Sequence, residues 1–374
     1  MKERWTQLPD WQRILALLVS SRVALALVAT LAVAVLPISS RQLQLLPDLP
    51  WLQPWAQWDS LHYVTIAVDG YAPPSESWSN VVFFPLYPLL MRLLAMPFGP
   101  VTHESAALAG LVVSNVALFG ALLYLALLVA RDLSLDVSRR VVLYVLVFPT
   151  TLFLSAAYAE ALFLLLGVAS LYHARQGEWY RAGLAGFLAA LTRPFGVFVL
   201  VPLAVELVRQ RASPAAWPSL LMVPAGLALY FGFLWWQFGD PFAYLSAAGR
   251  GWDRGLHLPW ETLAAYLRGP LEVFDWPHAW LDLLSMAAVL ILTVIGWRLL
   301  PASYSAYSTV ALLFALSAGE AWFSAARHAL AIFPVIIVLA VLGERRAFNW
   351  TWLALSALLA GAFMARVAVG YWVA

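Results

Sequence analysis

A short stretch near residue 60 gathers the side chains from which catalytic sites are built. Asp59, His62 and Tyr63 supply a carboxylate, an imidazole and a phenol close together in the chain. On a helix, Asp59 and His62 would share a face because they are three residues apart, and Gly70 would end that helix. A carboxylate held in this way can remove a proton from a hydroxyl group. The same pattern is typical of an amphipathic helix on a membrane surface, and these residues alone leave both interpretations open.

Other polar residues stand at the ends of apolar runs. Tyr158 and Glu160 begin one run, Arg193 separates two short runs, and Arg327 and His328 begin another. An arginine in apolar surroundings is costly unless it is paired or faces water, so Arg193 is expected to bind a phosphate or a site carboxylate through its planar fork of donors. The alternatives are a snorkelling role for Arg193 and a plain helix-capping role for Glu160.

Two arginines stand four residues apart in the segment 239–280. Arg250 and Arg254 would share a helix face and could hold an anionic headgroup, although a solvated loop face has the same pattern. Arg22 lies near the middle of the first apolar run, and the sequence indicates no partner for it.

The composition indicates an all-α protein that crosses a membrane many times. Of the 374 residues, 63% are hydrophobic and 11% are charged, whereas soluble domains have about 25% charged residues. Several apolar runs exceed the roughly 18 residues that cross a bilayer. We therefore expect one membrane domain, residues 1–374, with a bundle of about eleven transmembrane helices. The expected spans are 13–37, 104–130, 138–155, 158–175, 180–192, 195–209, 216–238, 281–299, 303–319, 327–343 and 348–370.

The charges predict the orientation. With a cytoplasmic N-terminus, the short inner loops are nearly all basic, as the positive-inside rule requires, and most acidic residues lie outside. Two long loops, 38–103 and 239–280, are then extracytoplasmic. Their many apolar residues and tryptophans predict interfacial helices, one of them over 83–97. Lys2 is the single lysine, and the other side chains of this charge class are arginines. Such usage suggests a GC-rich bacterial genome, and therefore a bacterial plasma membrane.

Several chemistries are excluded or not expected. The chain has no cysteine, which excludes disulfides and thiolate nucleophiles. A net charge of +2 is too small to indicate a nucleic-acid partner. Asp59 and His62 would provide only two ligands, and two ligands do not define a metal site, so neither a metal nor a cofactor is expected.

The order of residues after Trp58 resembles a known family. Trp58-Asp59, His62-Tyr63, Ile66-Ala67 and Gly70-Tyr71, followed by Phe83-Phe84-Pro85-Leu86-Tyr87-Pro88, resemble the PIG-V membrane mannosyltransferases. Three later elements extend the resemblance: Ser155-x-x-Tyr158-x-Glu160-x-x-Phe163, Thr192-Arg193-x-x-Gly196, and Arg327 with Phe333-Pro334. His328 departs from the family pattern, which has an aromatic residue there.

The resemblance implies a GT-C-class bundle and an inverting glycosyltransferase. Its donor would be polyprenyl-phosphate mannose, and its acceptor a hydroxyl group of a lipid-linked or glycan molecule outside the cytoplasm. Asp59 would be the base, with Asp69 and Glu160 as alternatives. The expected substrate contacts are His62, Tyr63, Tyr158, Glu160, Arg193, Arg327, His328, Arg250 and Arg254. Eukaryotic members act on a glycolipid-anchor precursor that a bacterium lacks, so the acceptor stays open.

Two other functions compete with this one. A transporter or flippase of a lipid-linked glycan would also need an outward polar cavity, but it predicts inverted repeats, and none is visible in the sequence. A non-catalytic subunit of a glycosylation complex is the third possibility, against which the presence of Asp59 argues.

Overall fold

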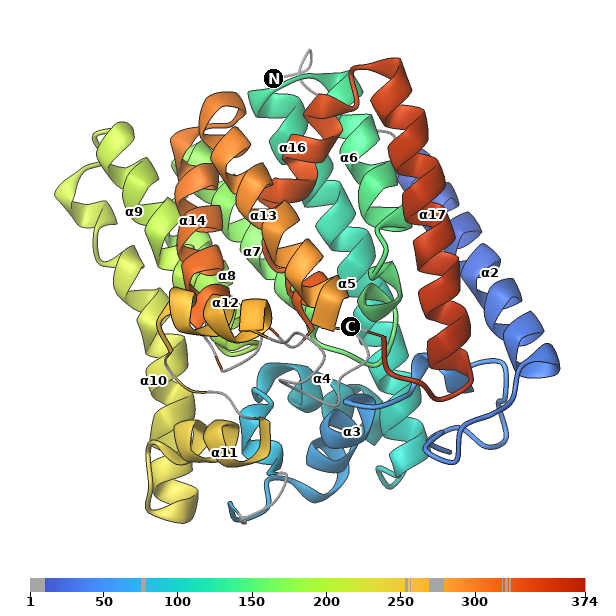
Figure 1. Ribbon diagram of the computed structural model, residues 1–374. Helices are drawn as coiled ribbons and strands as arrows, with labels where there is room; N and C mark the ends of the chain where they lie inside the picture. Colours follow the sequence, from blue (N-terminus) through green and yellow to red (C-terminus); the bar gives the residue numbers. More distant parts are fainter. Residues whose placement is uncertain are drawn as a thin grey trace.

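The molecule is a bundle of helices with a smaller group of short helices at one end (Figure 1). The computed structural model describes residues 11–74, 79–252, 255, 257–268, 279–317, 319, 322 and 324–373. Over these residues the regular structure consists of α-helices and short 3₁₀ helices, without strands. The predicted all-helical fold is therefore confirmed.

Five helices are long and apolar enough to cross a membrane. They are α2 (Trp11–Val35), α5 (His103–Asp132), α10 (Ser219–Phe238) with the preceding η6 (Pro214–Ala216), α13 (Ala279–Leu299) and α17 (Arg346–Ala368). Each coincides with an expected span.

The other six expected spans coincide with shorter or interrupted helices, so the number eleven is not confirmed. These helices are α6 (Leu135–Val147), α7 (Glu160–Gln176), α8 (Trp179–Ala190), α9 (Leu200–Arg209) after η5 (Pro194–Val199), α14 (Ala302–Ser317), and α15 (Ala325–His328) with α16 (Pro334–Leu342).

Prolines explain two of the interruptions. The span expected over 138–155 ends early, because Phe148 precedes Pro149 and takes an extended conformation with ψ 141°, as residues before proline do. The 3₁₀ helix η4 (Thr151–Leu154) follows. Pro334 likewise starts α16 as a new helix after α15.

Helix α5 lies at the centre of the bundle. It packs against α7, α4, α6 and α2, while α10 packs against α8 and α17 against α2. Figure 1 shows α9 and α10 at one side and α2 and α17 at the other. A continuous buried apolar cluster fills the space between these helices.

The loop 38–103 folds into the short helices at the lower end in Figure 1. It contains η1 (Gln53–Trp55), α3 (Ser60–Asp69), η2 (Asn80–Val82), α4 (Leu86–Ala95) and η3 (Met96–Phe98). The predicted stop at Gly70 is confirmed, since this residue follows α3 with φ 85°, a conformation that glycine adopts without strain.

The second long loop also contains helices. Helix α11 (Ala243–Trp252) packs against η2 and α10, and α12 (Pro259–Arg268) packs against α14. The helices predicted in both loops are therefore present among the described residues.

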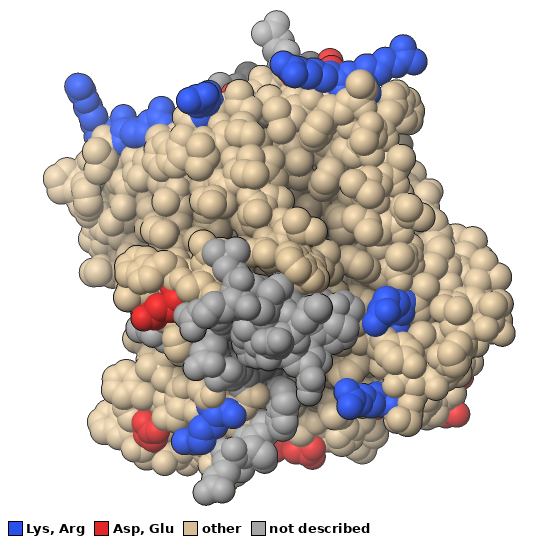
Figure 2. Space-filling model, in the orientation of Figure 1, with Lys and Arg blue, Asp and Glu red and all other residues tan. Residues whose placement is uncertain are grey.

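Charged side chains lie at the two ends of the bundle. Figure 2 shows basic residues along the upper rim, charges of both signs at the lower end, and a wide uncharged band between them. Such a band is what a protein that crosses a bilayer exposes to lipid.

A buried ionic network joins four helices at the end of α7 opposite Glu160. Arg175 pairs with Asp132 at 2.7 Å and with Glu206 at 3.2 Å, and Tyr304 donates a hydrogen bond to Asp132. Both carboxylates are buried. The network therefore links the ends of α5, α7 and α9 to α14.

Candidate active site

The chain makes a sharp turn immediately before Asp59. Trp58 has φ 55°, a left-handed conformation that is uncommon for a bulky residue and that gathers at functional sites. Gln57 is buried, and its side chain bonds to the backbone of Leu43 and Gln53. This loop therefore fixes where α3 begins, with Asp59 at the N-cap position.

Four charged side chains meet next to this turn. Arg327 Nη1 lies 2.6 Å from Asp59 Oδ2, and Arg327 Nε also bonds to Glu160 Oε1. Arg193 Nη1 lies 2.5 Å from the same Glu160 oxygen. Exposed fractions are 23% for the Asp59 side chain, 11% for Arg193, 8% for Arg327 and 2% for Glu160. Asp59 is therefore the member of this charge cluster that is most open to a substrate.

Glu160 is placed by the start of α7. The N-terminus of a helix favours a carboxylate through its exposed N–H groups and its dipole, which suits Glu160 as the first residue of α7. Its predicted contact with the substrate stays a prediction. Ser114 on α5 donates a hydrogen bond to the Tyr158 carbonyl, 3.0 Å away. Asn115 donates another to Ser155. The central helix thus holds the segment that carries Glu160.

Tyr158 positions Asp59 directly. Its hydroxyl donates to the Gln57 carbonyl at 2.9 Å and accepts from the Asp59 N–H at 3.1 Å. The Arg327 guanidinium lies over its ring, 4.6 Å from the centroid, which is cation–π distance. The structure shows that Tyr158 orients two members of the charge cluster, and the substrate contact predicted for it stays a prediction.

Arg193 projects from the break between α8 and η5. The backbone at Arg193 is extended, with φ −158° and ψ 156°, and the chain then folds back on the end of α8. Gly196 makes this possible, because a Cβ atom there would overlap the carbonyl oxygen of Ala189. The predicted interruption at Thr192–Pro194 is confirmed, and Arg193 contacts a carboxylate as predicted.

Arg327 is held by several contacts to its short helix. Ser324, which precedes α15, has φ 62°. The Ala325 N–H donates to Asp282 Oδ1 on α13 at 2.8 Å, and Thr150 donates to the Ala326 carbonyl at 3.0 Å. Sequence reasoning missed Asp282 and Thr150 as supports of Arg327, because neither is near it in the chain.

Aromatic rings cover the charge cluster. Trp372 packs edge-on against Trp58 with ring centroids 5.6 Å apart, and it also lies 5.7 Å from Phe153. Arg327 lies 5.8 Å from the Trp372 ring and 5.1 Å from that of Phe153. The last described residues of the chain, which carry no element of the family pattern, thus form one wall of the site.

His62 and Tyr63 belong to an aromatic layer next to Asp59. His62 stacks on Phe83 at 4.6 Å, and Tyr63 packs edge-on against Phe83 and Tyr87 at 5.0 Å. Burial lowers the pKa of the His62 imidazole, and the Asp59 charge opposes this shift. Burial also raises the pKa of the Tyr63 phenol.

Some predicted residues lie elsewhere. His328 follows Arg327 on α15, and its ring packs against Phe195 with ring centroids 5.6 Å apart. Arg250 is exposed on α11 and makes none of the ion pairs of the charge cluster. Arg254 falls outside the described residues.

Asp69 and Arg22 also lie outside the charge cluster. Asp69 is at the far end of α3, 61% exposed and 3.8 Å from His103. Arg22 bonds to the carbonyl and hydroxyl oxygens of Thr151, at 3.2 and 2.9 Å. The sequence could not show this partner, which is remote in the chain.

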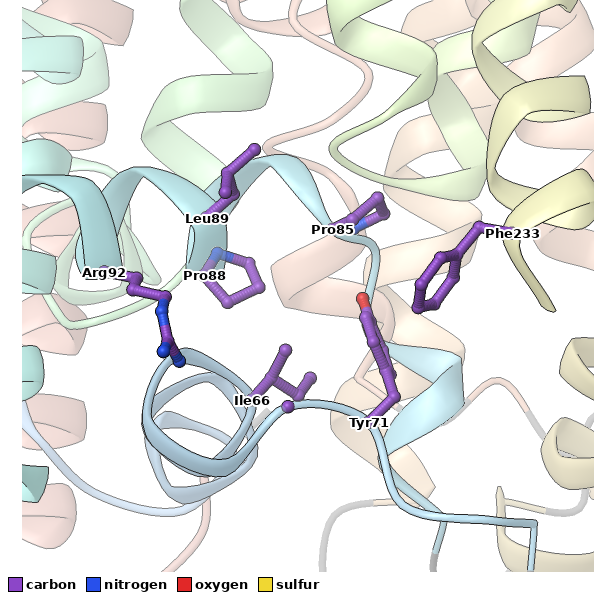
Figure 3. Close-up of a pocket in the computed structure, with 8 residues that line it drawn as sticks. Ile66, Tyr71, Pro85, Pro88, Leu89, Arg92 and Phe233 are labelled. Atoms are coloured by element: carbon purple, nitrogen blue, oxygen red, sulfur yellow. The ribbon is translucent and has the colours of Figure 1, made fainter. Parts of the chain in front are cut away.

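A cavity of about 240 Å³ lies between the C-terminal end of α3 and α4 (Figure 3). Ile66 and Tyr71 line it together with Pro85, Leu89 and Phe233, and Arg92 stands at one end. Arg92 donates to the Ala67 and Val68 carbonyls, at 2.9 and 3.0 Å, and thereby caps the last turn of α3. The cavity is apolar and contains no member of the charge cluster.

The arrangement combines a partly exposed carboxylate, Asp59, with two arginines whose donors can contact an anionic group. The two carboxylates and two arginines balance in charge. In the described part of the chain, no three histidine or acidic side chains lie close enough to hold a metal ion together.

The fold and the site together define a class of protein: helical membrane proteins of the GT-C fold. ArnT from Cupriavidus metallidurans, bound to undecaprenyl phosphate, superposes with a TM-score of 0.52 at 11% identity, over 92% of this chain and 63% of ArnT. At that identity the likeness concerns the fold alone.

Sequence comparison identifies the family. The family model for mannosyltransferase (PIG-V) matches residues 19–211, just over half of the chain. GPI α-1,6-mannosyltransferase 2 from Mus musculus is 30% identical over 185 residues, which are 46% of this chain and 36% of the mouse protein. The Rattus norvegicus protein is 32% identical over 149 residues, 38% of this chain and 29% of the rat protein. The chain belongs to the PIG-V mannosyltransferase family, although the match spans only about a third of these relatives.

Proposed function

We propose that this protein transfers a sugar, mannose in the first instance, from a polyprenyl-phosphate donor to a hydroxyl group of a lipid-linked or glycan acceptor. The family supports the sugar and the reaction, and the fold it shares with ArnT, which was solved with undecaprenyl phosphate, supports the donor. The observation that carries the proposal is the buried charge cluster in which Arg327 joins Asp59 to Glu160.

Asp59 acts as the base in this proposal. The acceptor oxygen attacks the anomeric carbon, its proton passes to Asp59, and the bond from that carbon to the phosphate oxygen breaks. A single displacement inverts the anomeric centre. Asp59 fits the role better than the alternatives, because Glu160 is 2% exposed between two arginines and Asp69 lies at the other end of α3.

Arg193 and Arg327 stabilise the phosphate as it leaves. Donors placed where negative charge develops stabilise that charge and lower the barrier. The two arginines are held by Glu160 and, for Arg327, by the Tyr158 ring. The proposal requires neither a metal nor a cofactor, since these cations provide the positive charge.

The reaction would take place on the extracytoplasmic side. The basic rim in Figure 2 lies at the end of the bundle away from α3 and α4. Basic residues favour the cytoplasmic side, which supports a cytoplasmic N-terminus and an outward site. Membership of a mannosyltransferase family favours an enzyme over a transporter.

The test is transfer of labelled mannose from polyprenyl-phosphate mannose into membrane lipids. We expect transfer by the wild-type chain, also in the presence of a chelator, and loss of at least about a hundredfold in Asp59→Asn and Asp59→Ala. Asp69→Asn is the matched control, because it removes the same charge from the other end of α3. Transfer that survives both Asp59 substitutions would refute the assigned base. Absence of transfer by the wild-type chain with every polyprenyl-phosphate sugar would refute the donor class.

A further inference from the structure

The guanidinium of Arg327 is already engaged by two carboxylates. Nε bonds to Glu160 and Nη1 bonds to Asp59. Nε and one N–H of Nη1 are taken, while the guanidinium has five N–H donors in all. A phosphate can therefore approach the remaining donors, but it can occupy the position of Asp59 against Nη1 only if this carboxylate gives up its place.

The two carboxylates differ in how firmly they are held. Glu160 is 2% exposed and also pairs with Arg193 at 2.5 Å. Asp59 is 23% exposed, and its ion pair within the described residues is the one with Arg327. Removing Glu160 would leave Arg193 without a buried counter-charge, which is strongly unfavourable. Asp59 is consequently the partner that can leave.

Protonation of Asp59 would release it at the required moment. We propose that Arg327 exchanges Asp59 for the leaving phosphate in the step in which Asp59 takes the acceptor proton. This inference rests on the proposed function and assigns Arg327 the role of coupling proton removal to departure of the phosphate.

The charges balance throughout this step. Before it, Asp59 and Glu160 are negative, both arginines are positive, and the donor phosphodiester carries one negative charge. The acceptor oxygen then forms its bond to the anomeric carbon. The acceptor O–H bond breaks, and its proton neutralises Asp59. The anomeric C–O bond breaks, and its electron pair gives the phosphate a second negative charge. Arg327 loses one anionic partner as another gains charge, so no buried cation is left unpaired.

Two fixed contacts make the exchange local. Arg327 keeps its Nε bond to Glu160, and its guanidinium remains over the Tyr158 ring. Only the Nη1 side then changes partner. A lysine at this position could not do the same, because its ammonium has no rigid fork with which to hold one anion while it exchanges another.

The exchange predicts that a neutral residue at position 59 improves binding of the product phosphate. The probe is undecaprenyl phosphate, titrated into the full-length protein in lipid nanodiscs. Asp59→Asn mimics protonated Asp59 and should bind the probe about tenfold more tightly than the wild type, because Arg327 is free for the phosphate. Asp69→Asn removes the same formal charge from α3 and should bind like the wild type.

A double substitution isolates Arg327. Arg327→Gln should weaken binding, and Asp59→Asn combined with Arg327→Gln should lose the gain that Asp59→Asn shows alone. Asp59→Ser serves as a second neutral variant, and a cooperative thermal transition in each protein verifies the fold.

Three results would overturn the exchange. The first is that Asp59→Asn and Asp59→Ser bind the probe no tighter than Asp69→Asn. The second is that the gain in affinity persists when Arg327 is also substituted, which would indicate a general charge effect. If neither the wild type nor any variant binds the probe, the proposed donor class is refuted together with the exchange.

Discussion

At the scale of single residues, the Tyr158 hydroxyl links the loop before α3 to the charge cluster. It accepts from the Asp59 N–H and donates to the Gln57 carbonyl. A buried group that loses its hydrogen-bond partner costs about 1–3 kcal/mol, and a small displacement of a base can slow a reaction considerably.

We therefore expect Tyr158→Phe to keep the ring under Arg327 but to release Asp59. Mannosyl transfer should fall about tenfold, while the free energy of unfolding falls by about 1–3 kcal/mol. The measurements are transfer rate and thermal unfolding in detergent. Tyr230→Phe is the control, because its buried hydroxyl donates to the Val81 carbonyl away from the charge cluster. Equal losses of transfer in both variants would show that Tyr158 has no special effect on Asp59.

The sequence predicted the charged residues of the site but not their supports. Asp59, Glu160, Arg193 and Arg327 could be found because a charge in an apolar chain is costly and calls for a partner. The pairing itself could not be found, since Asp59 and Arg327 are 268 residues apart. Trp372 gave no signal, because an aromatic residue in a membrane protein is common.

At the scale of elements, the break between α8 and η5 sets the position of Arg193. The chain can reverse there because Gly196 lies against the backbone of Ala189. The sequence indicated the break through Thr192–Pro194, since proline cannot continue a helix. It did not indicate the close approach at Gly196, which depends on how the chain folds back.

Gly196→Ala is therefore expected to push η5 away from α8. Crowding of this kind costs about 1–3 kcal/mol and should move Arg193 away from Glu160, so that transfer per folded molecule also declines. Thermal unfolding and transfer rate are the measurements. Gly232→Ala on α10 is the control, because an added Cβ there meets nothing within 4 Å. If both variants behave like the wild type, the close approach at Gly196 is required neither for stability nor for transfer.

At the scale of the whole molecule, two ionic groups lie at opposite ends of α7. The charge cluster at Glu160 serves the proposed chemistry, and the network around Arg175 joins α5, α7, α9 and α14. This network could not be predicted from the sequence, because Asp132 and Glu206, the partners of Arg175, are 43 and 31 residues away from it in the chain.

We expect Arg175→Gln to destabilise the bundle by about 3–5 kcal/mol, because it removes the cation that pairs with the buried Glu206 and leaves the buried Asp132 with the weaker contact to Arg131 at 3.7 Å. The folded fraction should transfer mannose normally, since the network is remote from Asp59. Unfolding in denaturant and transfer per folded molecule are the measurements. Arg181→Gln is the control: its pair with Glu178 is exposed, and exposed pairs contribute little. A stable Arg175→Gln variant with impaired transfer would contradict this division of roles.

The position of Arg327 late in the chain also has a consequence for biosynthesis. Glu160 and Arg193 are made within 33 residues of each other and can neutralise one another as soon as α8 is inserted. Asp59 can form its ion pair only after α15 has left the ribosome, because its partner is Arg327. A nascent chain stopped between residues 211 and 320 would then contain the Glu160–Arg193 pair but not the partner of Asp59, and quality control could distinguish it from the finished protein by the charge of Asp59.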